Sequence, residues 1–158
     1  MRWAGLGDPR WPSEIDNREA KEAVAGQLAS RASDGDVIGI GSGSTSFLAL
    51  LALRTRVQRE GLRIRCVPTS LEIESYCTQL GLDVTTLVNA RPDWCFDGAD
   101  EVDPDDNLIK GRGGAFVREK LVFVASPRRF ILVDSSKFVD RLGTNHKLPL
   151  AVIPEAVN

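Results

Sequence analysis

Carboxylates, lysines and backbone dipoles must carry the chemistry of this chain, because His146 is its only histidine and stands in a polar stretch where exposure is expected. Six acids fall within residues 97–106. Such a cluster is more often a solvated loop, but Asp97 and Asp100 come directly after an apolar run. In open α/β sheets ligands bind beyond the carboxyl ends of strands, so this position favours a binding edge. A calcium loop starting at Asp103 is excluded, since glycine and glutamate are missing from its sixth and twelfth positions.

A second candidate loop, Gly41-Ser-Gly-Ser-Thr-Ser46, lies between an apolar strand and an apolar helix. Free N–H groups at a helix start, joined by the hydroxyls of Ser42, Ser44 and Thr45, suit a phosphate. The loop has no lysine for a nucleotide-binding Gly-x4-Gly-Lys motif and no third glycine for a dinucleotide fingerprint. It therefore suits a small phosphate ester better than a nucleotide. A plain tight turn with capping serines is an equal alternative.

Lys110 opens a glycine-rich stretch, residues 111–114, whose glycines let the chain wrap closely round a ligand. Glu119 follows about one turn into the next predicted helix. On spacing alone Glu119 is more simply an exposed helix carboxylate, and its neighbours Arg118 and Lys120 are expected to face solvent. The segment Asp134-Ser-Ser-Lys137 follows another apolar strand and is most simply a polar turn.

The elements that position these loops alternate between strands and helices. Asp16-Asn-Arg-Glu19 is a capping box that predicts a helix ending at residues 34–36. The other expected elements are strands 37–40, 63–67, 83–87, 93–96 and 129–133, helices 47–58, 70–80 and 114–125, and a strand-like segment 148–154. This repeated βαβ order predicts an α/β fold, a Rossmann-like and mainly parallel sheet with flanking helices. Residues 1–16 are expected to form an irregular arm whose Trp3 and Trp11 serve packing or subunit contact.

Composition excludes several classes of protein. The 158 residues, 42% of them hydrophobic, suffice for one domain with a core. The formal charge of -2 gives no long-range positive field that would attract nucleic acid. No apolar run approaches the roughly 20 residues that span a bilayer. The first residues lack the apolar segment and small-residue cleavage site typical of a secretory signal, so none is expected here. Three widely spaced cysteines, Cys66, Cys77 and Cys95, fit neither a disulfide framework nor a zinc site, so we expect a reducing, cytoplasmic compartment.

Taken together, these segments resemble ribose-5-phosphate isomerases of the A type. The matching stretches are Gly39-Ile-Gly-Ser-Gly-Ser-Thr45, Asp97-Gly-Ala-Asp-Glu-Val-Asp-Pro104, Asn107-Leu-Ile-Lys-Gly-Arg-Gly-Gly-Ala115, Arg118-Glu-Lys120, Val133-Asp-Ser-Ser-Lys137, and Leu142-Gly143 with Pro149-Leu150. They occur in the family's order across residues 17–154. The resemblance implies interconversion of ribose 5-phosphate and ribulose 5-phosphate without a metal or organic cofactor, in a homodimer or homotetramer.

The same resemblance implies a role for each motif residue. Glu119 would be the base that moves a proton between C2 and C1, and Lys110 would stabilise the enediolate oxygen. Asp97 and Asp100 would bind sugar hydroxyls and assist ring opening. The implied substrate-binding set is Lys21, Ser42, Gly43, Ser44, Thr45, Asp97, Gly98, Ala99, Asp100, Lys110, Gly111, Arg112, Gly113 and Lys137. Lys21 and the hydroxyls and N–H groups of residues 42–45 match positions near the phosphate.

Two departures from the family pattern leave alternatives open. Arg112 stands in a loop that is often four consecutive glycines. Family members also continue into a small second α/β domain, most of which is missing here, so we expect residues 17–147 to form the catalytic domain and residues 148–158 to begin a truncated second one. A non-catalytic sugar-phosphate-binding module and an inactive remnant are the alternatives to an isomerase. Lys110 and Glu119 favour an enzyme, because a binder needs neither an oxyanion partner nor a base.

Overall fold

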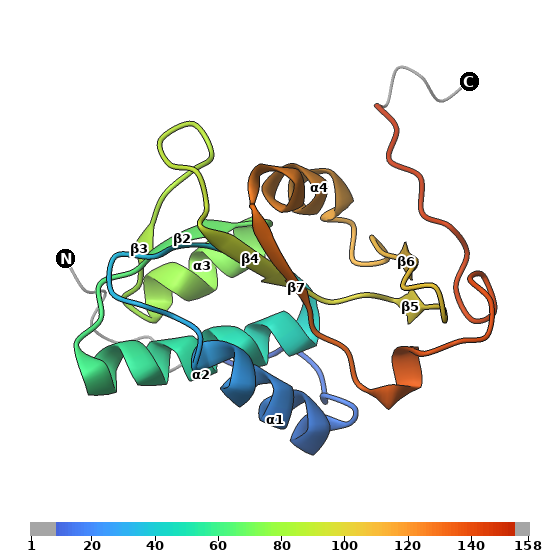
Figure 1. The fold of residues 1–158 in the computed structure, drawn as a ribbon, viewed down its shortest axis with the longest axis horizontal. Coiled ribbons are helices and arrows are strands. Elements are labelled where there is room, and N and C mark those ends of the chain that lie inside the picture. The colour runs from blue at the N-terminus through green and yellow to red at the C-terminus, as the bar shows by residue number, and fades with distance from the viewer. Residues whose placement is uncertain (1–8, 154–158) are drawn as a thin grey trace.

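Apolar runs of the chain assemble into a five-stranded parallel sheet in the computed structural model, which describes residues 9–153 (Figure 1). The strands are β1 (Val37–Ile40), β2 (Arg65–Pro68), β3 (Asp83–Val84), β4 (Trp94–Asp97) and β7 (Arg128–Ile131), in the order β3–β2–β1–β4–β7. A separate antiparallel pair joins β5 (Glu101–Val102) to β6 (Leu108–Ile109). The predicted α/β fold with a parallel sheet and flanking helices is confirmed.

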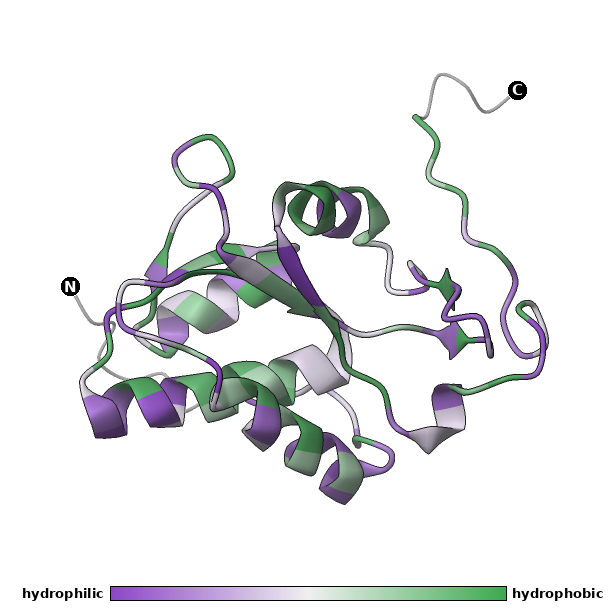
Figure 2. Ribbon diagram, viewed as in Figure 1, coloured by the Kyte–Doolittle hydropathy of each residue, from purple (hydrophilic) through white to green (hydrophobic). Residues whose placement is uncertain are grey.

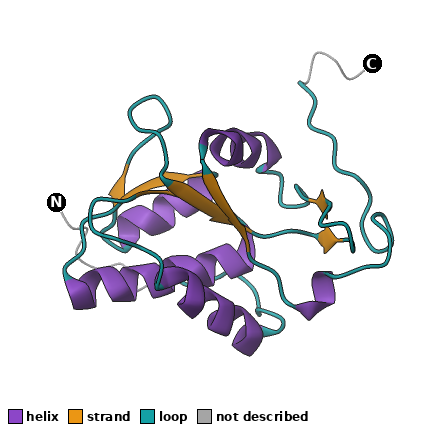
Figure 3. Cartoon of the chain, viewed as in Figure 1, coloured by secondary structure: helices purple, strands orange, loops and turns teal. Residues whose placement is uncertain are grey.

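Helices cover both faces of the sheet. The helices are α1 (Arg18–Ala29), α2 (Gly43–Glu60), α3 (Leu71–Gln79), α4 (Phe116–Ala125) and the short 3-10 helix η1 (Ser135–Lys137). Helices α1, α2 and α3 lie on one face and α4 on the other (Figures 1 and 3). Alternation along β1 and β4 explains this arrangement. Ile38 and Trp94 join the larger core under α1–α3, whereas Val37 and Cys95 pack against Val122 of α4.

The register of the two central strands brings their following loops together. Ile40 of β1 pairs with Phe96 of β4, so Gly41 and Asp97 come next to each other at the carboxyl edge. The chain passes from β1 to β2 on one side and returns to β4 on the other, which makes this edge the topological switch point. The backbone N–H of Leu132 donates to the carbonyl of Asp97, which brings the segment after β7 to the same edge.

Several local predictions are corrected by the structure. Helix α2 begins at Gly43 instead of residue 47, so most of the predicted small-residue loop is the first turn of the helix. The capping box is wrong: the residue preceding α1 is Asn17, in a left-handed conformation with φ of 50°, and its side chain does not cap the helix. The expected strand 83–87 shortens to β3, and β5 lies unpredicted inside the acidic stretch 97–106.

Apolar residues also occur outside the core, for example in the extended segment near the C-terminus (Figure 2). Trp11 packs against Phe47 with ring centroids 5.5 Å apart, as the packing prediction requires, while Trp3 lies outside the described residues. The three cysteines are free and buried. The expected strand at 148–154 is wrong for residues 148–153, which form no strand and expose four large apolar side chains: Leu148, Leu150, Val152 and Ile153. In the described part of the chain, every helix is too short or too polar to cross a bilayer.

Candidate active site

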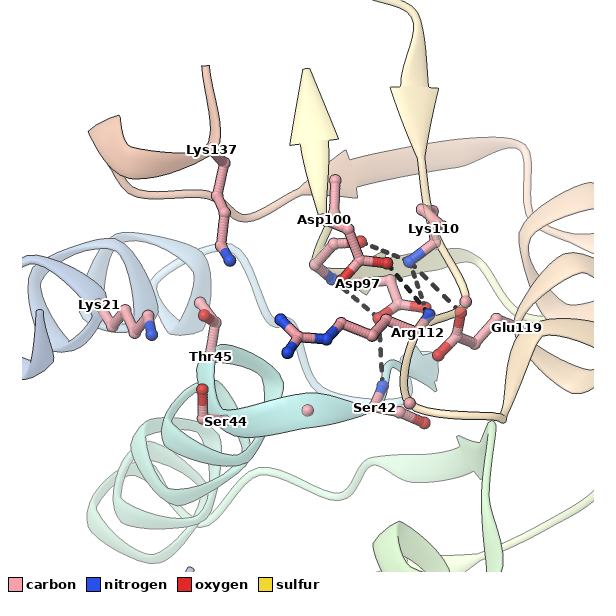
Figure 4. A pocket seen from close by; sticks show the side chains of 15 residues that line it. Lys21, Ser42, Ser44, Thr45, Asp97, Asp100, Lys110, Arg112, Glu119 and Lys137 are labelled. Carbon is pink, nitrogen blue, oxygen red and sulfur yellow. Dashed lines mark hydrogen bonds and ion pairs between the residues drawn. The ribbon is translucent and has the colours of Figure 1, made fainter. Parts of the chain in front are cut away.

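A pocket of about 150 Å³ opens at the carboxyl ends of β1 and β4 (Figure 4). Its lining consists of the residues that the resemblance implies for substrate binding and catalysis, including the four expected catalytic side chains. They are Lys21, Ser42, Gly43, Ser44, Thr45, Asp97, Gly98, Ala99, Asp100, Lys110, Gly111, Arg112, Gly113, Glu119 and Lys137. Segments from five parts of the chain therefore meet in one cleft. The individual roles of these residues remain predictions.

Lys110 lies at the centre of the polar contacts. It directly follows β6, which aims its ammonium towards the sheet edge. The Lys110 Nζ donates to the carbonyl of Gly98 and lies 3.2 Å from Asp97 Oδ2 and 3.4 Å from Glu119 Oε2. One cation thus faces two carboxylates on the side of the pocket where β4 and α4 meet.

Asp97 is buried at the end of β4 and held by backbone donors. Its Oδ1 accepts hydrogen bonds from the N–H groups of Ser42 (3.1 Å) and Gly98 (2.8 Å). Burial raises the pKa of the Asp97 carboxyl, although the charge of Lys110 and these hydrogen bonds oppose the rise. The absence of a side chain at Gly41 allows the close approach, since a Cβ there would lie 2.5 Å from both the Cα and Oδ1 of Asp97.

Glu119 stands in the first turn of α4 with its side chain turned into the pocket. The side chain is only 8% exposed, so the simpler expectation of an exposed helix carboxylate is wrong. Burial and the negative charge of Asp97 raise the pKa of Glu119, and Lys110 partly opposes them. Arg118 and Lys120 beside it are exposed, as predicted. The arrangement supplies a carboxyl group whose proton affinity is increased, next to a fixed ammonium.

The hairpin of β5 and β6 carries a third carboxylate and the loop that covers the pocket. Asp100 is tied to the hairpin by its N–H, which donates to Ile109, and its Oδ2 accepts from the N–H of Arg112 at 3.1 Å. The loop turns sharply at Gly111, where φ is 105°. The side chain of Arg112 extends across the pocket towards Thr45 (Figure 4).

The opposite end of the pocket is cationic. Lys21 comes from the first turn of α1 and Lys137 from η1, and both face Ser44 and Thr45 at the start of α2 (Figure 4). The first N–H groups of a helix lack intrahelical partners and, with the helix dipole, favour an anion. The Ser42 hydroxyl was expected near the phosphate. It instead forms a hydrogen bond with the Thr69 hydroxyl, and the two oxygens are 2.7 Å apart. Ser42 contributes its backbone N–H to Asp97 instead.

Sequence reasoning missed one buried carboxylate beside the site. Glu101 is fully buried and accepts backbone N–H groups of Gly143 at 2.6 Å and His146 at 2.8 Å. Burial acts to raise the pKa of Glu101, but these backbone donors lower it overall. Glu101 thus fastens the segment after η1 to the hairpin that carries Asp100. Its neighbour Val102, one apolar residue in an acidic run, was the only local signal.

The chain is similar to known proteins of one family. The model of the family "Ribose 5-phosphate isomerase A (phosphoriboisomerase A)" matches residues 65–158. Ribose-5-phosphate isomerase A of a Synechococcus species is 46% identical over 138 residues, covering 86% of this chain and 60% of the relative. The chain therefore spans only part of the length of the curated relatives that it matches.

Solved structures agree with this assignment. Ribose 5-phosphate isomerase A from Methanocaldococcus jannaschii superposes with a TM-score of 0.79 at 38% identity, over 81% of this chain and 57% of that one. A second ribose-5-phosphate isomerase, solved in complex with phospho-erythronic acid, gives a TM-score of 0.77 at 35% identity, again over 81% of this chain and 57% of that one. The chain belongs to the ribose 5-phosphate isomerase A family.

Proposed function

We propose that this chain is an aldose–ketose isomerase that interconverts D-ribose 5-phosphate and D-ribulose 5-phosphate through an enediolate, with neither metal nor organic cofactor. The observation that carries the proposal is the Glu119–Lys110 pair, 3.4 Å apart in a pocket whose far end is cationic. A base and an oxyanion partner at one end and a phosphate-binding region at the other match the two ends of an open-chain sugar phosphate.

Glu119 is proposed as the base. Its ionised carboxylate takes the proton from C2 of the open-chain aldose, the electron pair forms the C1–C2 double bond, and the C1 oxygen becomes negative. Glu119 returns the proton to C1, while the proton of the C2 hydroxyl passes to the C1 oxygen. One carboxylate serves both carbons because they are adjacent. A raised pKa makes the ionised Glu119 a stronger base.

Lys110 is proposed to stabilise the negative oxygen of the enediolate, because its ammonium lies beside Glu119. Asp97 and Asp100 would bind sugar hydroxyls and assist ring opening. The phosphate would lie among Lys21, Lys137 and the start of α2. The complex of a relative with phospho-erythronic acid supports a sugar-phosphate ligand.

The proposal extends to the organisation of the protein. Residues 17–147 would form the catalytic domain, residues 1–16 an arm, and residues 148–158 the beginning of a second domain. The active form would be a homodimer or homotetramer.

Turnover of ribose 5-phosphate by the purified chain, measured in the presence of a chelator, tests the proposal. Glu119→Gln should lower kcat by about 10²–10⁴-fold, the usual worth of general base catalysis. Glu72→Gln is the matched control, because Glu72 occupies the first turn of α3 as Glu119 occupies that of α4, but lies outside the pocket. Its activity should equal that of the wild type.

Two results would contradict the isomerase. A folded chain that is stabilised by ribose 5-phosphate but does not turn it over would be a binding module. Activity that survives Glu119→Gln would remove Glu119 from the role of base.

A further inference from the structure

One buried carboxylate connects the two elements that carry the lysines of the pocket. Asp134 lies three residues beyond the end of β7, and its side chain is 2% exposed. Its Oδ1 accepts hydrogen bonds from the side-chain amide of Asn17 (3.0 Å) and the N–H of Ser136 (2.9 Å). Its Oδ2 lies 3.8 Å from Lys21 Nζ.

The first contact fixes the start of α1. Asn17 precedes the helix at a φ of 50°, yet its side chain makes no capping bond to its own helix. Asparagine adopts this left-handed conformation more readily than most residues. The conformation directs the amide to Asp134, which is 117 positions away in the sequence. The helix turn that contains Lys21 is thereby fastened to the segment after β7.

The second contact fixes η1. Asp134 is the N-cap of this short helix, and its side chain accepts the N–H of Ser136. Lys137 is the last residue of the same helix. A single carboxylate therefore sets the starting points of both segments from which Lys21 and Lys137 reach the pocket.

The third contact compensates a buried charge. Lys21 is nearly as buried as Asp134, and a buried ammonium without a counter-charge is costly. Within the described residues, Oδ2 of Asp134 has no hydrogen-bond partner, so the carboxylate attracts Lys21 without a direct hydrogen bond to it. Asp134 is also absent from the pocket lining, which includes Lys21 and Lys137. It stands behind the pocket wall and would not touch a ligand.

We propose that Asp134 is a positioning residue for phosphate recognition, which holds Lys21 and Lys137 together so that both ammonium groups face one phosphate. This inference rests on the proposed function for the identity of the phosphate ester. The local sequence pattern predicted only a polar turn at residues 134–137, and the resemblance implied no role for Asp134. A purely structural carboxylate, or one that weakens anion binding by its own charge, would behave differently in the following experiment.

The experiment measures dissociation constants for ribose 5-phosphate and for inorganic phosphate by calorimetry, with Glu119→Gln as the background so that turnover does not interfere. Adding Asp134→Asn, which keeps the shape but removes the charge, should raise both constants by the same factor, about tenfold or more. Asp103→Asn is the matched control. Asp103 also accepts an N–H two residues on and an asparagine amide, but faces no lysine.

A double-variant comparison separates positioning from general stability. With Lys21→Met present, Asp134→Asn should change phosphate affinity less, because only its contact with η1, which carries Lys137, then remains to be lost. Unchanged or tighter phosphate binding in Asp134→Asn, or an equal loss with and without Lys21, would overturn the inference. Should Asp134→Asn not fold, Asn17→Ala carries the test, since it removes one bond to Asp134 at an exposed site. It should weaken phosphate binding about two- to fivefold, and an unchanged constant would overturn the inference.

Different measurements would contradict the proposed function and this inference. Absence of turnover by the otherwise unmodified chain would contradict the isomerase, while the phosphate constants would still report on Asp134.

Discussion

Glu119, the proposed base, would serve catalysis at the expense of stability, because burial and Asp97 raise the pKa of its carboxyl above the ordinary value of 4.5. Proton abstraction needs the ionised form, so activity should fall as the pH drops through this raised pKa. Ionised Glu119 also destabilises the fold. That cost is absent below the unfolded-state pKa and grows as the pH rises through the folded-state pKa. Glu119→Gln should therefore raise the Tm at neutral pH and leave it unchanged near about pH 4. Calorimetry at both pH values checks this, and an unchanged or lower Tm at neutral pH would contradict it.

Arg112 is an exposed cation that lines the pocket. Its side chain extends towards the cationic end, where Lys21 and Lys137 lie (Figure 4). Because the residue is exposed, its attraction for a phosphate is screened by solvent. Arg112→Ala should raise the KM for ribose 5-phosphate about two- to fivefold, an effect that added salt reduces, with kcat retained. Arg118→Ala, at an exposed arginine on α4 outside this pocket, is the control for net charge. Equal KM values for the two variants would show that Arg112 does not contact the phosphate.

At the scale of elements, apolar patterning predicted the strands better than the turns. The run 37–40 is buried on both faces, and this is the pattern of a central parallel strand. Residues 43–46 resemble a loop because they are small and polar, yet they form the first turn of α2, which begins at Gly43 with a φ of 87°. Glu101 and Glu119 resemble surface carboxylates in sequence. The groups that surround them come from other elements: Gly143 and His146 bind Glu101, and Lys110 faces Glu119. Apart from the apolar Val102 beside Glu101, the local pattern therefore does not indicate their burial.

Gly41, the residue that follows β1, lies against Asp97 at the end of β4. A Cβ at Gly41 would lie 2.5 Å from Asp97 Oδ1, so the two strand ends would have to separate. Gly41→Ala should destabilise the fold by about 1–3 kcal/mol and lower activity by displacing Asp97. Gly26→Ala is the control, because nothing lies within 4 Å of the added Cβ and alanine favours the helix. Denaturant titration of both variants checks this, and a neutral Gly41→Ala would show that the strand ends adjust without cost.

At the scale of the whole molecule, the sheet edges are protected against association with another copy, whereas the outer face of α4 is not. Strand β3 has only two residues, and β7 begins with the exposed Arg128 and Arg129. Short and charged edges resist pairing with another sheet. The outer face of α4 instead exposes an apolar row with the spacing of a helix face: Val117 (55%), Leu121 (57%) and Val124 (59%). Association of copies is therefore expected through α4 rather than through strand pairing.

Sedimentation over a range of protein concentrations tests this expectation. The chain should associate reversibly, and Leu121→Glu should weaken the association at least about tenfold, because a charge would then be desolvated in the contact. Leu71→Glu is the control, since Leu71 is also exposed but lies on α3, across the sheet from α4. Association that survives Leu121→Glu would place the contact elsewhere. A monomer at every concentration would contradict the expected association. The α4 row would then face solvent, although an amphipathic helix of a globular protein normally buries such a row.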